Sequence, residues 1–261
     1  MSWRSPWRLI LSLAFLVVLL AYLLRHSPDG RVHLWLISPR EPGLLIVTPG
    51  GEAVLVGGGS DPVALRVFLG EHMPPLTRHL ALVVLPRADD ASLSAQADVL
   101  ERYSPAAAWH PSLDRNAPAQ AAWLDATAQS GDVSPLRVGL SQRVDGVTFT
   151  VWGLDPLVLG VELGALRLIY APDRSWQVAD IPPYARGATV WILKGVESAS
   201  EAMSPLPPLV VLGTLPASVW GSGSSDLTLL RAAQTTFLIG EAAEGFHLAT
   251  DGRQYRWDRS W

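Results

Sequence analysis

Short apolar runs alternate with amphipathic stretches along most of the chain. Apolar runs bounded by Gly, Pro or Asp predict strands, and apolar residues spaced three or four apart predict helices. The predicted strands are Val32–Ile37, Leu44–Thr48, Ala53–Val56, Leu80–Leu85, Val147–Trp152, Leu166–Tyr170, Thr189–Leu193, Leu209–Leu212, Phe237–Gly240, Phe246–Thr250 and Gln254–Trp257. The predicted helices are Val63–Glu71, Ser94–Tyr103, Ala117–Gln129 and Asp226–Ala233. This order predicts an α/β domain in which two sheets are sandwiched between helices.

Glycines mark the end of the third predicted strand. Gly57–Gly59 breaks the chain there, Ser60 or Asp61 is placed to cap the next helix, and Pro62 fits its first turn. Backbone amides at such a turn suit an anion, as they do at helix N-termini. A tight strand-to-helix turn explains the glycines equally well.

The N-terminal region predicts one transmembrane helix. Residues 9–24 carry no charge, lie between Arg8 and Arg25, and include twelve Leu, Ile, Val or Phe residues. Such a stretch favours membrane insertion by roughly 4–7 kcal/mol. A cleaved signal peptide is disfavoured because no small-x-small cleavage site follows. The predicted parts of the chain are a short N-terminal segment (1–8), a transmembrane helix (9–25), a linker (26–31), one domain (32–257) and a tail (258–261).

Composition and charge narrow the function classes. The chain has 261 residues and no cysteine, which excludes thiol nucleophiles, thiolate metal ligands and disulfides. Residues 31–261 hold 17 basic and 23 acidic residues, a net charge of −6. This charge disfavours tight binding to the phosphates of nucleic acids.

A resemblance to a known family rests on the first half of the domain. The apolar strand Leu82–Leu85 is followed by a short polar loop and by a helix that ends at Tyr103. Two glycine-containing segments come before it, Thr48–Gly51 and Val54–Gly59. This arrangement resembles the metallo-β-lactamase fold and, more narrowly, the extracytoplasmic C-terminal domain of ComEC-type DNA-uptake proteins. The resemblance implies a four-layer αββα sandwich on the outer face of the cell membrane, held there by a single span.

The metal-binding positions of that family are altered in this sequence. The family loop reads T-H-x-H-x-D-H, and paired histidines follow later in its sequence. The matching positions here, which we describe as vacated ligand positions, are Arg87, Asp89, Ala91, Ser92, Glu197 and Ser198. A further aspartate of the family is matched by Asp173. Because metal hydrolysis needs a firmly held cation that activates water, we expect no metal, no other cofactor and no catalytic residue.

Charged side chains near this loop leave alternatives open. Asp89, Asp90 and Asp173, with Asp61, are candidates for a rebuilt carboxylate site for Mg²⁺ or Ca²⁺. Adjacent aspartates before a helix are more often caps. Arg87 paired with Asp89 or Asp173 would instead fill the pocket with an ion pair, and we favour this interpretation. The six histidines include no pair spaced two to five residues apart, which disfavours a metal-ligand cluster, so we expect each to be a surface or partly buried imidazole.

Three functional hypotheses follow. The favoured one is a membrane-anchored, non-catalytic domain that binds or scaffolds a partner such as a membrane protein. A link to DNA uptake is implied by the resemblance alone. The alternatives are a metal-dependent hydrolase with a rebuilt carboxylate site and a structural membrane-tethered subunit.

Overall fold

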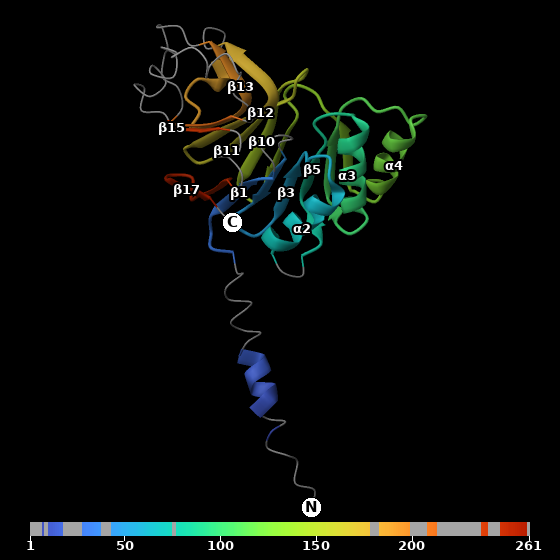
Figure 1. The fold of residues 1–261 in the computed structure, drawn as a ribbon, viewed down its shortest axis with the longest axis vertical. Helices are drawn as coiled ribbons and strands as arrows, with labels where there is room; N and C mark the ends of the chain where they lie inside the picture. Colours follow the sequence, from blue (N-terminus) through green and yellow to red (C-terminus); the bar gives the residue numbers. More distant parts are fainter. Residues whose placement is uncertain are drawn as a thin grey trace, which may run out of the picture.

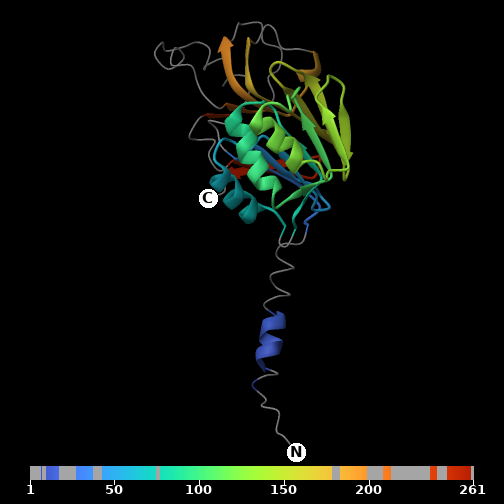
Figure 2. The ribbon, with the colours of Figure 1, turned by 90° about the vertical axis from the view of Figure 1, so that its right-hand side faces the viewer.

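Two large sheets pack face to face, and helices cover the outer face of one of them (Figure 1). Turned by 90°, the view shows these helices grouped on one side of the molecule (Figure 2). The computed structural model describes residues 7, 10–17, 28–37, 43–74, 77–177, 183–198, 208–212, 236–239 and 246–259.

The first sheet has eight described strands in the order β17-β16-β1-β2-β3-β5-β7-β8. Their bounds are β1 Val32–Leu36, β2 Leu44–Val47, β3 Ala53–Val56, β5 Leu82–Val84, β7 Ala107–His110, β8 Asp132–Pro135, β16 Phe246–Thr250 and β17 Tyr255–Arg259. Strands β1 to β3 form the antiparallel meander, whereas β3, β5, β7 and β8 run parallel. Parallel neighbours need crossover connections. These connections contain the helices α2 (Pro62–His72), α3 (Asp90–Leu100) and α4 (Pro118–Ala126).

The second sheet has seven described strands in the order β15-β14-β13-β12-β11-β10-β9. Their bounds are β9 Ser141–Val144, β10 Val147–Gly153, β11 Val158–Leu163, β12 Leu166–Gln177, β13 Val190–Ser198, β14 Leu209–Leu212 and β15 Thr236–Ile239. Strands β9 to β12 are antiparallel and β12 to β15 are parallel. The short strands β4 (His79–Leu80) and β6 (Ser104–Pro105) form a separate pair.

Alternate side chains of the first sheet enter two different cores. Leu44 and Ile46 of β2 pack into the core between the two sheets, together with Phe149 of β10. Leu45 of β2 points the other way and packs with the helices, among them Leu65 of α2. Because side chains alternate across a strand, an uninterrupted apolar run is expected where both faces of a sheet are covered.

Most of the predicted elements are present in the structure, with shifted ends. Helix α3 begins four residues before the predicted Ser94, because Asp89 caps it. The sequence interpretation missed β6, β7, β8, β9 and β11. Strand β11 was obscured by Gly160, at which a Cβ atom would lie 2.4 Å from the Trp152 ring. The glycine therefore makes room for a tryptophan on the neighbouring strand.

The described residues contain three of the four predicted layers, helices and two sheets, and the predicted helix Asp226–Ala233 lies outside them. Strand β17 runs to Arg259, so Asp258, expected in a tail, belongs to the first sheet and pairs with His247.

The N-terminal helix is described over residues 10–17. Within the described part of the chain, no helix has both the length and the apolar character that crossing a bilayer requires. Residues 9 and 18–25 of the predicted span lie outside the described residues.

The core between the sheets generates a stability prediction. Phe149 is fully buried there, so Phe149→Ala should lower the free energy of unfolding by about 3–5 kcal/mol. Urea unfolding followed by circular dichroism measures this loss. Val138→Ala is the control, because the Val138 side chain is exposed and its truncation should cost no more than about 0.5 kcal/mol. Equal losses in the two variants would contradict the assigned core.

Candidate functional site

A small pocket lies where strand ends from the two sheets meet. It has a volume of about 20 Å³, which is room for about one water molecule. The turn after β3, the loop after β5, the first turn of α3 and an irregular stretch of β12 supply its walls. The lining residues are Gly57, Gly58, Gly59, Pro86, Arg87, Ser92, Pro172 and Asp173.

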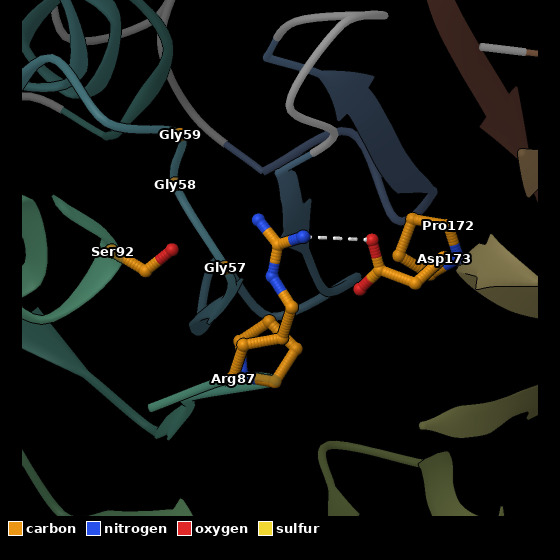
Figure 3. Close-up of a pocket in the computed structure, with 8 residues that line it drawn as sticks. Gly57, Gly58, Gly59, Arg87, Ser92, Pro172 and Asp173 are labelled. Carbon is orange, nitrogen blue, oxygen red and sulfur yellow. Dashed lines mark hydrogen bonds and ion pairs between the residues drawn. The ribbon is translucent and has the colours of Figure 1, made fainter. Parts of the chain in front are cut away.

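Arg87 lies at the centre of this pocket, between the glycine turn and Asp173 (Figure 3). Its Nη1 donates to Asp173 Oδ1 at 3.0 Å, and its Nε lies 3.2 Å from Asp89 Oδ2. The predicted ion pair is thus confirmed, with both carboxylates as partners. The Arg87 side chain is 49% exposed, so solvent screens these contacts and their net contribution to stability is small.

Asp89 has a second role at the start of α3. Its Oδ1 accepts the backbone N–H of Ser92 at 3.0 Å, and its Oδ2 accepts the Ser92 hydroxyl at 2.9 Å. Partial burial raises the pKa of Asp89, but the hydrogen bonds from Ser92 and the charge of Arg87 outweigh this effect and hold the pKa below its ordinary value. Asp89 is therefore an ionised helix cap, as predicted for the aspartates of this loop.

Asp173 reaches the pocket through an irregularity in β12. The pairing with β13 shifts between Ala171 and Ser175, where four residues of β12 span two residues of its neighbour. Such bulges redirect side chains. Tyr170, just before the irregularity, is fully buried; burial and the charge of Asp173 raise its pKa, against the opposing charge of Arg87. Its phenol therefore stays protonated and supplies no phenolate ligand or nucleophile.

The glycine turn is fixed by its close contacts. Gly57, Gly58 and Gly59 all have positive φ angles, a region that other residues adopt only with strain. A Cβ atom on Gly58 would lie 2.7 Å from Leu65 Cδ2, and Gly57 N–H donates to Val84 O at 2.9 Å. Because the Gly57 amide is already bonded within the sheet, it is not free for an anion, and tight packing explains the glycines.

Gln96 of α3 connects the helices to the pocket. The residue is buried, and its Nε2 donates to Gly57 O at 2.6 Å and to Val84 O at 3.0 Å. Its Oε1 accepts from Trp123 Nε1 at 2.9 Å. Sequence reasoning missed Gln96, although a glutamine among apolar helical positions is a signal that a buried polar group has partners.

The other predicted positions are not brought together as a metal site. Asp90 and Ala91 lie in the first turn of α3, and neither lines the pocket. Asp61 caps α2 by accepting from Val63 and Ala64 amides. The side chains of Glu197 and Ser198 lie outside the described part of the structure. Among the residues it describes, no three His, Cys, Asp or Glu side chains form a group that could hold a metal ion.

The described histidines are exposed or partly buried, as expected, but two of them contact each other. His33 Nδ1 lies 2.9 Å from His247 Nε2, although the two residues are 214 positions apart. Trp35 stacks on both rings and contacts His72 edge-on. Spacing along the chain did not reveal this contact because β1 and β16, from opposite ends of the domain, are neighbours in the first sheet.

Comparisons with known proteins agree on the fold. No family model and no curated protein matches the sequence. Among solved structures, the metallo-β-lactamase fold protein YhfI from Bacillus subtilis matches with a TM-score of 0.56 and 14% identity, over 84% of this chain and 100% of that one. Zn²⁺-bound PqqB from Methylobacterium extorquens matches with a TM-score of 0.51 and 14% identity, over 77% of this chain and 86% of that one.

The chain has the metallo-β-lactamase fold. One of these structures, that of PqqB, holds Zn²⁺, so the fit of the pocket to a metal ion matters. Asp173 of the pocket and the neighbouring Asp89 both contact the guanidinium of Arg87, which keeps its positive charge at any relevant pH. The described residues therefore do not fit a firmly held divalent cation.

The buried contacts of Gln96 generate a second stability prediction. Gln96→Leu leaves Gly57 O without this donor and Trp123 Nε1 without this acceptor inside the protein. Each unpaired buried group costs about 1–3 kcal/mol, so we expect a loss of roughly 2–6 kcal/mol in urea unfolding. Gln254→Leu on the exposed surface is the matched control. A loss no larger than that of the control would show that the Gln96 bonds do not hold the turn in place.

Proposed function

We propose that this chain is a single-pass membrane protein whose metallo-β-lactamase-fold domain binds or scaffolds a partner instead of hydrolysing a substrate. The observation that carries the proposal is the position of Arg87, in contact with both Asp89 and Asp173. On the resemblance to ComEC-type domains, Arg87 and Asp89 stand at two of the altered metal-ligand positions. In this proposal, the pocket is a degenerate metal site, one whose metal ligands have been replaced.

Electrostatics supports the loss of metal binding. At an effective dielectric constant of about 20, a divalent cation about 4 Å from a guanidinium is repelled by roughly 8 kcal/mol. Solvent screening at a half-exposed side chain reduces this figure without changing its sign. The two carboxylates would attract a cation, but each already has Arg87 as a partner. A metal would have to displace the arginine before it reached them.

The N-terminal helix supports membrane anchoring. The described side chains of residues 10–17 are all exposed, including Leu13 at 63% and Phe15 at 69%. Apolar helices with every face exposed are stable in lipid rather than in water. The placement of the domain outside the cytoplasm rests on the ComEC-type resemblance.

The net charge guides the choice of partner. The −6 charge of residues 31–261 disfavours tight binding of nucleic acid, so a membrane protein is the favoured partner and a role in DNA uptake would be indirect. A purely structural tethered subunit is the remaining alternative.

Recovery of a stoichiometric membrane partner after crosslinking in native membranes would support the binding role.

Metal analysis tests the non-catalytic assignment. The purified full chain, incubated with Zn²⁺ or Mn²⁺ and then dialysed, should retain well under one ion per chain by mass spectrometry and show no phosphodiesterase activity. A variant that restores the family's loop ligands, Arg87→His with Asp89→His, Ala91→Asp and Ser92→His, should bind more metal than the natural chain if it keeps its fold by circular dichroism. Stoichiometric metal in the natural chain, with hydrolysis abolished by Asp173→Ala, would instead establish the rebuilt carboxylate site.

Membrane extraction tests the anchor. The full chain should stay with membranes after alkaline carbonate treatment, whereas Leu13→Arg combined with Leu16→Arg should be released. Each arginine at the centre of a span costs about 2.5–3.5 kcal/mol, so the pair offsets the roughly 4–7 kcal/mol that favours insertion. Val138→Arg, on the exposed surface of the domain, is the matched control and should stay with the membranes. Release of the unaltered chain would refute the anchor.

A further inference from the structure

A chain of four titratable side chains joins the two ends of the domain. His33 Nε2 lies 2.9 Å from Asp29 Oδ1, His33 Nδ1 lies 2.9 Å from His247 Nε2, and His247 Nδ1 lies 3.0 Å from Asp258 Oδ1. Asp29 and His33 belong to the start of the domain. His247 and Asp258 belong to β16 and β17 at its C-terminal end. This chain is separate from the Arg87 pocket and from the proposed function.

The hydrogen-bond pattern fixes how many protons the two imidazoles can hold. Burial raises the pKa of Asp29, but hydrogen bonds from His33 and from the Arg31 amide outweigh it and keep the carboxylate ionised. Ionised carboxylates only accept hydrogen bonds, so with both aspartates ionised the outer ring nitrogens, His33 Nε2 and His247 Nδ1, donate to them. The contact between the inner ring nitrogens, His33 Nδ1 and His247 Nε2, then needs an N–H group on one of them and a lone pair on the other. The two rings together therefore hold three protons and one positive charge.

A fourth proton does not fit this arrangement. It would place two N–H groups against each other at the 2.9 Å separation of the inner nitrogens, with no acceptor between them. It would also place two imidazolium charges on stacked rings whose centroids are 5.2 Å apart. All three native contacts form together only while the pair carries one charge.

The contacts of His247 lie on the edge of the first sheet. Strand β16 pairs with β1 on one side and with the edge strand β17 on the other. Trp35 of β1 stands directly opposite His247 in the register and stacks on it at 4.8 Å. The histidine contacts therefore join the β16–β17 hairpin to the body of the sheet through side chains as well as backbone.

Solvent reaches this junction through a second pocket. A cavity of about 270 Å³ is lined by Asp29, Arg31, His33, Trp35 and His72, among others. The charged and titratable groups around the two imidazoles are Asp29 and Arg31 before β1, His72 at the end of α2, and Asp258 on β17. Protons can thus exchange with bulk water without unfolding of the domain.

We propose that His33 and His247 form an acid-sensitive latch that closes the β16–β17 hairpin onto β1. In the closed latch the inner nitrogens share one proton. When acid adds a further proton, the inner contact breaks and the hairpin loses its side-chain hold on β1.

The pH window follows from the electrostatics of His247. Partial burial lowers the pKa of His247, and the charges of His33 and His72 add to this effect against the hydrogen bond to Asp258. The unfolded chain takes up its proton near pH 6.5, before the folded one. The contribution of the neutral His247 ring to stability is therefore fully present above about pH 6.5 and is lost as the pH falls below it, because the unfolded state then binds more protons.

Thermal unfolding of the purified full chain between pH 8 and pH 5 tests the latch. The melting temperature of the natural chain should fall with acidification by about 2–4 °C more than that of His247→Gln. His79→Gln, which removes an exposed histidine elsewhere, should keep the pH dependence of the natural chain. If His247→Gln and His33→Gln both decline as steeply as the natural chain, the latch is refuted.

A measurement on the natural chain keeps the test decisive if these variants do not fold. Correlation spectra of the histidine ring nitrogens should show the His247 ring still mostly neutral, with its proton on Nδ1, at pH 6.5. Hydrogen exchange, corrected for its intrinsic pH dependence, should show residues 246–258 losing protection at pH 5 before β5 does. Simultaneous protonation of both rings near pH 6.5, with uniform loss of protection, would overturn the proposal.

Discussion

Strands β2 and β3 are buried along their whole length, and this burial on both faces is the constraint on which the rest of the fold depends. A sheet with two apolar faces must be covered twice. The second sheet covers one face, and α2, α3 and α4 cover the other. The parallel strands end on the same edge, so their following loops meet there. The pocket of Gly57 and Arg87 is a direct consequence of that geometry.

The chemistry of this edge is set by a single basic side chain. Arg87 follows β5 and lies between the cap of α3 and the irregular stretch of β12. It joins parts of both sheets through Asp89 and Asp173, as a cation shared by carboxylates would. Because the guanidinium is covalently part of the chain and always charged, it holds these carboxylates without lowering the pKa of a water molecule. In the proposed function, the pocket therefore keeps the arrangement of a binding edge without a means to activate a nucleophile.

The structural neighbours show the fold of this chain, whereas its own side chains decide the chemistry. At 14% identity, YhfI and PqqB share with this chain the path of the backbone. Function depends on the side chains placed on that backbone. Here the described side chains include a buried glutamine that ties α3 to the glycine turn and a histidine pair that ties the two ends of the domain together. Neither arrangement follows from the fold alone.

Local order was largely determined by the sequence. The alternation of apolar runs and turn residues predicts the meander of β1 to β3, and the polar loops predict the cap at Asp61 and the pairing of Arg87 with Asp89, because each depends on residues close together in the chain. Asp173, 86 positions from Arg87, was indicated only by the family resemblance. Strand β11 escaped prediction because Gly160 is explained only by the Trp152 ring that packs over it. The histidine chain escaped for a related reason. His33 and His247 meet through the register between β1 and β16, and strand register across 214 positions is decided by the packing of the whole sheet, which no local pattern encodes.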